Sequence, residues 1–317
     1  MKQRRIENKN IARKNRVSWK KIFLVIFIIL FVSAAAFSTF VIIKNHNKNK
    51  VTINTLKQKW SQYDYSGLYE VGKTFLQDNP YNNTALTYYS YACYYLAVSQ
   101  NDTYLAQEYL DECINNLRMA LYNASKALLP QLQYMLGKAY FYKNTISTYY
   151  YADLAIKYLN LAKENGYQAD DIPEYLGLSY ASLGMTMESI SAFTEALLVR
   201  ESDSLLLSIA EQYYKIKQYN AAEQYLFRVS NTSKNEDILI RSKVLMGNIY
   251  LDKEEYDEAL KIFNEIIAEN DNVADAHYGI GLVYEKQNNM VKARAEWRKT
   301  LKIQVNHAGA YKKLSEN

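Results

Sequence analysis

The chain has 317 residues, with only 10 Gly and 3 Pro but 31 Tyr. Helix breakers this sparse, spread over so long a chain, predict an all-α protein. The net charge of +5 is unevenly distributed, because residues 51–317 contain 26 Lys and Arg against 32 Asp and Glu, a net charge of −6. A mildly acidic main body argues against a nucleic-acid-binding protein, whose domain would be basic.

The first 50 residues have the composition of a membrane anchor. Residues 1–21 form a basic tail, with nine Lys or Arg against one Glu, and residues 22–43 contain no charge at all. As a helix this uncharged stretch would be about 33 Å long, enough to cross a hydrocarbon core of ~30 Å. The sequence therefore predicts a single transmembrane helix over 22–43, followed by a polar linker over 44–50.

The uncharged stretch has two interpretations. Ala34-Ala35-Ala36 is similar to the small-residue cleavage site of a signal peptide, whose apolar region is shorter. The apolar run continues to Ile43, which favours an uncleaved anchor. Because the more basic flank stays in the cytoplasm, we expect a single-pass protein of the bacterial inner membrane. Its tail 1–21 is then cytoplasmic and its main body extracytoplasmic, in the periplasm.

Residues 67–74, GLYEVGKT, match the spacing of a phosphate-binding loop from Gly67 to Thr74. Such a loop follows an apolar strand and opens a long helix. Here the preceding residues are polar and helix-like, and Pro80 stands only a few residues later. We therefore interpret the stretch as the second helix of a helix pair. A nucleotide-binding protein or enzyme that uses Lys73 and Thr74 is the alternative.

Residues 83–128 contain a less regular pair of predicted helices. TYYSYACYYLA is typical of a first helix and CINNLRMA of a second, and residues 99–112 between them predict an unusually long connection. Cys93 and Cys113 fall on the two helices. They are either small buried packing residues or a disulfide formed in an oxidising compartment, and the sequence leaves both open.

The later part of the chain is repetitive. The same residue types recur 34 positions apart in two segments, in the pairs Gly247 and Gly281, Tyr250 and Tyr284, Ala259 and Ala293, and Phe263 and Trp297. Further copies begin at Leu136, Leu176 and Ile209, the first with a connection about six residues longer than the others. In each copy a small residue allows close helix approach, and a large side chain fills the space beside it.

This pattern resembles the tetratricopeptide repeat (TPR) family, which has Leu-Gly-x-x-Tyr on a first helix and Ala-x-x-x-Phe on a second. The resemblance covers nearly all of residues 51–317. It implies a right-handed α-solenoid of about seven helix-turn-helix repeats with a concave face. It further implies a membrane-anchored TPR protein that binds a protein or peptide partner and is not an enzyme.

No catalytic, cofactor or metal site is predicted. His46, His277 and His307 are the only histidines, and none has the spacing of a metal ligand. Acidic pairs such as Glu254-Glu255 fall on predicted turns and solvated faces.

The resemblance also assigns a partner groove to this chain. In the family the groove is lined by first-helix side chains that point away from the second helix. Carried over by register, these are Tyr134, Lys138, Phe141, Leu207, Glu211, Tyr214, Val244, Asn248, Leu251, Tyr278, Leu282 and Glu285. The set is mixed, with few charges.

Three functions follow as hypotheses. The first is an extracytoplasmic scaffold or adaptor with a protein partner of unknown identity, acting as an envelope assembly or chaperone-like accessory factor. The second is the nucleotide-binding alternative based on Gly67–Thr74. The third is a structural spacer that associates only with itself, so a homo-oligomer is possible. Residues 22–43 would contact the lipid bilayer, and no nucleic acid is expected.

Overall fold

The computed structural model describes residues 19–48 and 51–316. Within these ranges every regular element is an α-helix, as the composition predicts. Contacts divide the chain between residues 55 and 56 into two compact units. Most of the predicted basic tail, residues 1–18, and the end of the predicted linker, residues 49–50, lie outside the described residues.

The first unit contains the helix α1 (Trp19–Lys48), which covers the uncharged stretch. All the side chains described between residues 23 and 40 are exposed. The helix continues to Lys48, so residues 44–48 of the predicted linker are helical. Among the described residues, no helix combines the length and the apolar character needed to cross a membrane.

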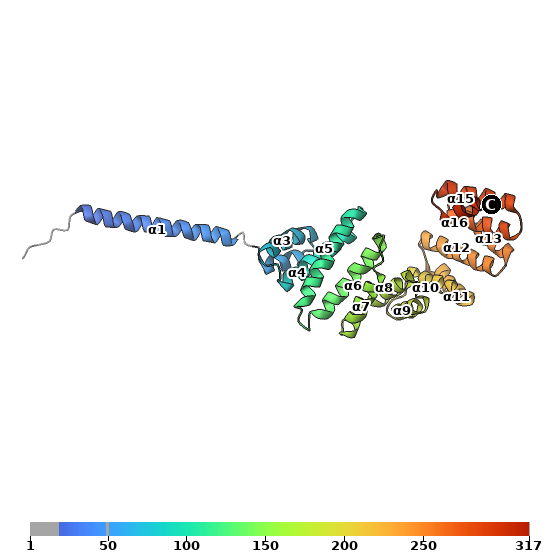
Figure 1. Cartoon of the computed structure of the whole chain (residues 1–317), viewed down its shortest axis with the longest axis horizontal. Helices are drawn as coiled ribbons and strands as arrows, with labels where there is room; N and C mark the ends of the chain where they lie inside the picture. The colour runs from blue at the N-terminus through green and yellow to red at the C-terminus, as the bar shows by residue number, and fades with distance from the viewer. Residues whose placement is uncertain (1–18, 49–50, 317) are drawn as a thin grey trace, which may run out of the picture. The chain divides into compact units, whose positions relative to one another are not determined.

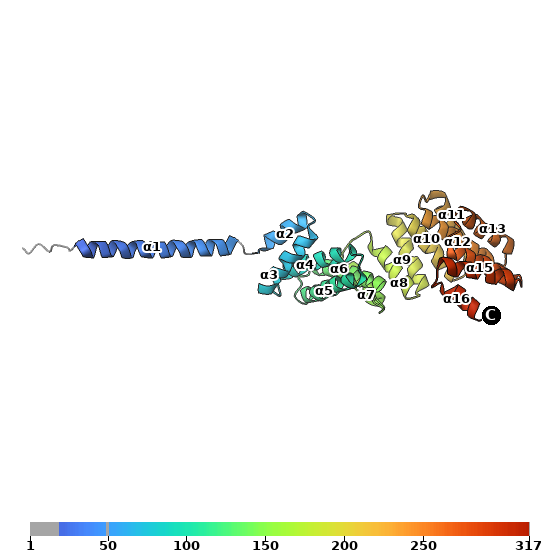
Figure 2. The same ribbon diagram turned by 90° about the horizontal axis from the view of Figure 1, so that it is seen from above.

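From residue 53 to residue 316 the chain forms seven consecutive helix pairs and one final helix, in agreement with the predicted number of repeats. The first helices of the pairs are α2 (Ile53–Ser61), α4 (Asn83–Val98), α6 (Leu129–Ile146), α8 (Ile172–Ser182), α10 (Asp203–Lys215), α12 (Glu236–Asp252) and α14 (Ala274–Lys286). The second helices are α3 (Tyr65–Asp78), α5 (Thr103–Tyr122), α7 (Ala152–Glu164), α9 (Thr186–Val199), α11 (Tyr219–Thr232), α13 (Tyr256–Glu269) and α15 (Met290–Ile303), and α16 (Ala308–Ser315) ends the array. From α4 onward the two helices of each pair pack together (Figures 1 and 2).

In several pairs the two helices come close where a glycine on the first helix faces a large side chain on the second. A Cβ atom placed on Gly281 would lie 2.3 Å from the Nε1 atom of Trp297, and one on Gly247 would lie 2.6 Å from Phe263. Gly137 faces Leu159 in the same way, which confirms the register predicted for the copy with the longer connection. No Cβ can approach this closely, so these contacts require glycine.

The second helix pair corrects one prediction. The stretch 99–112 was expected to be mostly connection, but α5 already begins at Thr103. Asp102 caps this helix, since its side chain accepts hydrogen bonds from two backbone N–H groups of the first turn. Ala106 and Leu110 then continue the buried stripe of Cys113. The amphipathic spacing of these residues therefore extends the helix by more than two turns.

The glycine-rich stretch is a helix, as interpreted, and the phosphate-loop alternative is wrong. Residues 67–74 lie inside α3 (Tyr65–Asp78), where the backbone N–H groups bond within the helix and cannot surround a phosphate. The N–H of Gly67 donates to the capping carboxylate of Asp64 at 2.8 Å. Gly72 is buried against the ring of Tyr89, so it serves the packing of α3 on α4.

The repeats carry their own core. Several buried hydrophobic clusters consist of residues after position 59 and join neighbouring helix pairs, or the last pair to α16, and residues 56–317 form one compact unit. Stability from neighbour contacts is the expected behaviour of a solenoid, so the unit 56–317 has the contacts that it needs to fold on its own. Cys93 and Cys113 lie buried in one cluster as free thiols whose pKa burial raises, which agrees with their interpretation as packing residues.

Candidate functional site

The twelve predicted groove residues all lie on first helices, namely α6, α10, α12 and α14. Successive first helices contact one another from α4 through α8 and again from α10 through α14. We call the surface formed by these adjoining sides the inner face. It consists of an N-terminal stretch on α4, α6 and α8 and a C-terminal stretch on α10, α12 and α14.

The C-terminal stretch contains a pocket of about 230 Å³. Its lining comes from three successive first helices and the residue before α14, namely Glu211, Ile240, Arg241, Val244, Leu245, Asn248, Val273 and Asp275. Glu211, Val244 and Asn248 were predicted from the register. The structure therefore brings residues from α10 and α12 together, as the groove hypothesis requires.

The pocket combines an apolar base with a few polar groups. Arg241 Nη2 donates to Glu211 Oε1 at 2.6 Å across the gap between α12 and α10. The half-buried amide of Asn248 makes no hydrogen bond within the described residues. A primary amide is both a donor and an acceptor, so Asn248 can pair with the backbone of an extended peptide. Ile240, Val244 and Val273 offer apolar contact.

Two predicted groove residues are not accessible. Leu207 is 1% exposed and Leu251 is 7% exposed, and each belongs to a buried hydrophobic cluster. They pack in the core beneath the inner face and are not part of its surface. Half-buried Tyr214 lies beside Tyr219, and burial together with a hydrogen bond to Asp252 raises its pKa.

The remaining C-terminal groove residues lie against the final helix. The ring of Tyr278 is 4.7 Å from that of His307, and Glu285 accepts hydrogen bonds from Lys313 Nζ at 2.6 and 2.8 Å. Leu282 packs beside buried residues of α15 and α16. The helix α16 therefore occupies the end of the inner face.

The N-terminal stretch centres on Lys138. Its Nζ lies 2.9 Å from Asp171 Oδ2 and 3.1 Å from the hydroxyl of Tyr134. It also lies 4.9, 5.1 and 5.8 Å from the ring centres of Tyr175, Tyr134 and Tyr94, within the range of cation–π attraction. Tyr134 donates to both carboxylate oxygens of Asp171 at 2.8 and 2.7 Å. Burial and this carboxylate raise the pKa of Tyr134.

Aromatic rings extend this cluster in both directions. Phe141, also a predicted groove residue, lies 4.8 Å from Tyr175 in an edge-on contact. On the other side Tyr95 stacks on Tyr65 with ring centres 4.4 Å apart, and both rings lie about 6 Å from Trp60. The result is an aromatic strip along α2, α4, α6 and α8.

Sequence reasoning missed several inner-face residues. Asp171, Arg241 and Asp275 each lie six positions before the repeat glycine of their helix, at Gly177, Gly247 and Gly281. Each is thus seven positions, almost two helical turns, before the residue that directly follows the glycine, which is the register position of Asn248 and Leu282 in the predicted groove, so the same face is presented again. The register could therefore have found all three. Tyr95 and Trp60 lie on helices without a repeat glycine, which left their register unassigned.

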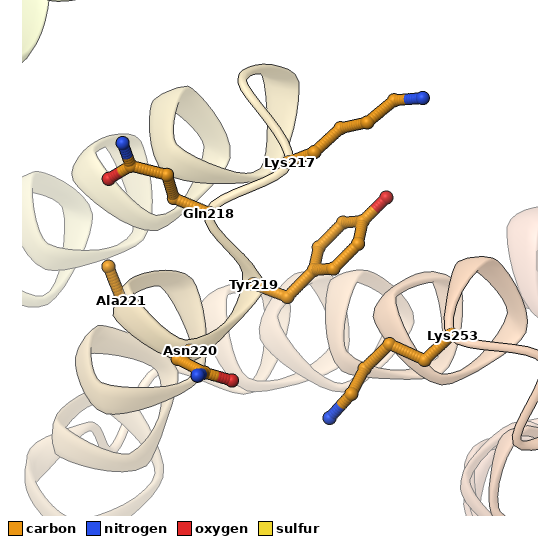
Figure 3. A pocket seen from close by; sticks show the side chains of 6 residues that line it. All are labelled: Lys217, Gln218, Tyr219, Asn220, Ala221 and Lys253. Carbon is orange, nitrogen blue, oxygen red and sulfur yellow. The ribbon is translucent and has the colours of Figure 1, made fainter.

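Another pocket lies at the turns between helices, and its polar groups do not converge. It has a volume of about 440 Å³ and is lined by residues at two inter-helix turns, namely Lys217, Gln218, Tyr219, Asn220, Ala221 and Lys253. Figure 3 shows the ammonium groups of Lys217 and Lys253 pointing away from each other. Lys253 is paired with Glu223 at 3.0 Å. This pocket therefore offers no common binding point for one ligand.

His277 and His307 have structural partners. His277 is buried, with Nδ1 2.7 Å from Glu296 Oε2 and Nε2 3.1 Å from the backbone oxygen of Asp271. His307 caps α16, since its Nδ1 accepts from the N–H of Ala310. Within the described residues no group of three His, Cys, Asp or Glu side chains could hold a metal ion.

The fold can now be compared with known proteins. Residues 167–312 match the family model described as the tetratricopeptide repeat protein 21 C-terminal ARM domain. A curated relative, the anaphase-promoting complex subunit CDC16 of Saccharomyces cerevisiae, is 20% identical over 272 residues, which is 79% of this chain and 32% of the relative. The chain thus spans about a third of the length of that relative.

Two solved structures extend the comparison. The C-terminal part of a TPR repeat-containing protein from Cytophaga hutchinsonii has 16% identity and a TM-score of 0.52, and the match covers 83% of this chain and 99% of that one. The Cut9–Hcn1 structure of the anaphase-promoting complex has 14% identity and a TM-score of 0.48, with 80% and 52% covered. The similarity to the Cytophaga structure shows that this chain has a TPR-like fold. Its helix pairs and its glycine–aromatic contacts fit that fold.

Proposed function

We propose that this chain is a membrane-anchored scaffold that holds its TPR-like repeats outside the cytoplasm and binds a segment of a partner protein on the inner face. The observation that carries the binding proposal is the pocket between α10, α12 and α14. It joins side chains of successive repeats around Asn248, whose amide has no hydrogen-bond partner among the described residues, as recognition of a peptide backbone requires. An envelope assembly or chaperone-like accessory role fits such a scaffold.

Photo-crosslinking in cells tests the binding proposal. A photoreactive residue at Val244 or Tyr278 on the inner face should capture one or a few defined polypeptides, which mass spectrometry identifies. Phe227 is the matched control, because it is 65% exposed on the second helix α11. Equal capture from Phe227, or none from the inner face, would contradict a binding role for that face.

The anchoring proposal is supported by the sequence, namely the uncharged stretch 22–43 and the basic tail before it. A protein held in this way resists extraction with alkaline carbonate. Protease added to intact spheroplasts should digest the repeats, whereas a cytoplasmic marker should survive. Release by carbonate would overturn the anchor, and full protection of the repeats would overturn the orientation.

A further inference from the structure

The N-terminal stretch of the inner face differs from the pocket described above in its chemistry. Together with neighbouring residues of α2, α3 and the α7–α8 connection, it presents aromatic rings and a carboxylate, namely Trp60, Tyr65, Tyr95, Tyr134, Tyr167 and Asp171. We call this set the tyrosine face. Tyr95 is 39% exposed, and Trp60, Tyr65 and Tyr167 are half-buried. A partner that lies along α4 and α8 meets ring faces and an acid group.

We propose that the tyrosine face is the docking site for a cationic segment of the partner, one that presents Arg or Lys side chains to the rings and to Asp171. This assignment rests on the proposed function, since it specifies the partner of the same scaffold. Cation–π attraction to the rings and ion pairing with the carboxylate act on the same charge.

Lys138 shows that this surface already accommodates a positive charge. Its ammonium lies within 5.8 Å of three tyrosine ring centres and 2.9 Å from Asp171. The lysine side chain is only 16% exposed, whereas that of Asp171 is 37% exposed. The Lys138 side chain therefore lies deeper in the surface than Asp171, and an approaching partner meets the carboxylate first. Within the part of the chain that the structure describes, Oδ1 of Asp171 accepts a hydrogen bond from Tyr134 alone, so it can accept a further donor.

The exposed rings lie close to that carboxylate. Tyr167 stacks on Tyr134 at 4.7 Å, and Tyr134 donates to Asp171. Burial raises the pKa of Tyr95, and the charge of Asp171 and the hydroxyl of Tyr167 raise it further, as expected when the three groups are neighbours. A guanidinium in contact with Tyr167 would therefore lie close to the Asp171 carboxylate, because Tyr134 joins these two groups.

The charge of the surrounding repeats has the matching sign. Residues 51–199, the first four repeats, contain 9 Lys and Arg against 14 Asp and Glu, a net charge of −5. Several of these cations are already paired, including Lys59 with Asp64 and Lys163 with Glu195. A negative field attracts a basic segment and disfavours an acidic one.

The test uses short fluorescent peptides of alternating Arg and Ser, Glu and Ser, or Pro and Ser, titrated into the full chain in detergent and into residues 51–317. Only the Arg-Ser peptide should bind, and its affinity should fall as salt is added. Asp171→Asn and Tyr95→Leu should each weaken binding by about tenfold, because each removes one of the two attractions.

Matched controls isolate the site. Asp170→Asn removes the same charge one residue earlier from an exposed side chain, and Tyr104→Leu removes a ring that is 72% exposed on α5. Neither should change the affinity. An equal loss with Asp170→Asn would overturn the proposal, because binding would then follow overall charge.

Three other outcomes would also overturn it. Equal binding of the Pro-Ser peptide would make the partner proline-rich. Binding to residues 51–317 but not to the full chain would make the chain's own basic tail, residues 1–21, the occupant. Absence of Arg-Ser binding, with inner-face crosslinks still present, would refute the cationic partner and leave the scaffold function intact. Absence of both the Arg-Ser binding and the inner-face crosslinks would refute the proposed function itself.

Discussion

The two stretches of the inner face use the same register for different chemistry. On α6 the register positions hold Tyr134 and Lys138 within an aromatic cluster, and on α12 the corresponding positions hold Val244 and Asn248 beside an Arg–Glu pair. The contacts that join the two helices of a repeat are similar in both halves. The contacts that hold the helix pairs together are therefore independent of the side chains that the inner face presents.

The halves also differ in how they bury tyrosine. Tyr89, Tyr91, Tyr94 and Tyr140 are all at most 6% exposed in one cluster that joins the first three repeats. No tyrosine after residue 200 in the described chain is fully buried. Burying a phenol is favourable only while it is neutral, so the two halves should respond differently to alkali.

The largest expected difference is therefore in alkaline unfolding. Burial raises the pKa of Tyr89, Tyr91 and Tyr94 above the ordinary value. The unfolded chain loses these protons near pH 10, whereas the folded chain keeps them, so the free energy of unfolding falls as the pH rises. Each such tyrosine contributes a loss of about 1.4 kcal/mol per pH unit above ~10.

Tryptophan fluorescence can locate this transition. Residues 51–317 contain Trp60 in the first repeat and Trp297 in the seventh. In a Trp297→Phe variant the remaining Trp60 reports on the N-terminal half, and in a Trp60→Phe variant Trp297 reports on the C-terminal half. The Trp60 signal should change at the lower pH. Coincident transitions, or an earlier change at Trp297, would mean that tyrosine burial does not set the alkaline limit of the N-terminal half.

A smaller effect is expected from the contact that the halves share. Gly247→Ala places a Cβ against the ring of Phe263 and should cost about 1–3 kcal/mol of stability. In the fifth repeat the corresponding residues are Ala210 and Leu226, and both are buried in one cluster. The double variant Gly247→Ala with Phe263→Leu copies that pair.

Urea unfolding of the single and double variants measures the coupling. The double variant should lose less stability than the sum of the two single losses, because the smaller leucine makes room for the new methyl group. Simple additivity would show that the ring is not what excludes a side chain at position 247.

The sequence predicted the fold wherever a glycine marked the register. Gly247 and Gly281 located their helix pairs, and Gly137 did so despite the longer connection. On α4 the position is occupied by Ser90, which is buried and donates to the backbone oxygen of Leu86. Serine does not mark the register as glycine does, so the register of this helix pair was not recognised. The start of α5 was therefore predicted too far along the chain.

The candidate site was predicted only in part, for a related reason. Register arguments identify which side chains face the groove, but not which of them another helix covers. Leu207 is buried and Glu285 is paired with Lys313, and both effects depend on side-chain packing in three dimensions. The cluster of Lys138 and Asp171 joins residues 33 positions apart, a pairing that no local pattern contains.

The smallest expected effect concerns the turn between the two helices of each repeat. Lys217 and Glu254 both have a positive φ, of 59° and 63°, and they occupy the turn position where the fourth repeat has Gly184. A side chain in this left-handed region costs about 1–2 kcal/mol, part of which glycine's greater flexibility offsets. Lys217→Gly and Glu254→Gly should therefore each stabilise the chain by about 0.5–1 kcal/mol.

The urea midpoint of residues 51–317 measures this gain, and two variants serve as controls. Gln218→Gly, one residue later at an ordinary φ of −84°, should destabilise. Gly184→Ala should also destabilise, because it introduces the strain that Lys217 already carries. If Lys217→Gly lowered the midpoint as Gln218→Gly does, the lysine side chain itself would have to stabilise the turn. Because Lys217 is exposed and its ammonium points away from that of Lys253 (Figure 3), relief of backbone strain should dominate.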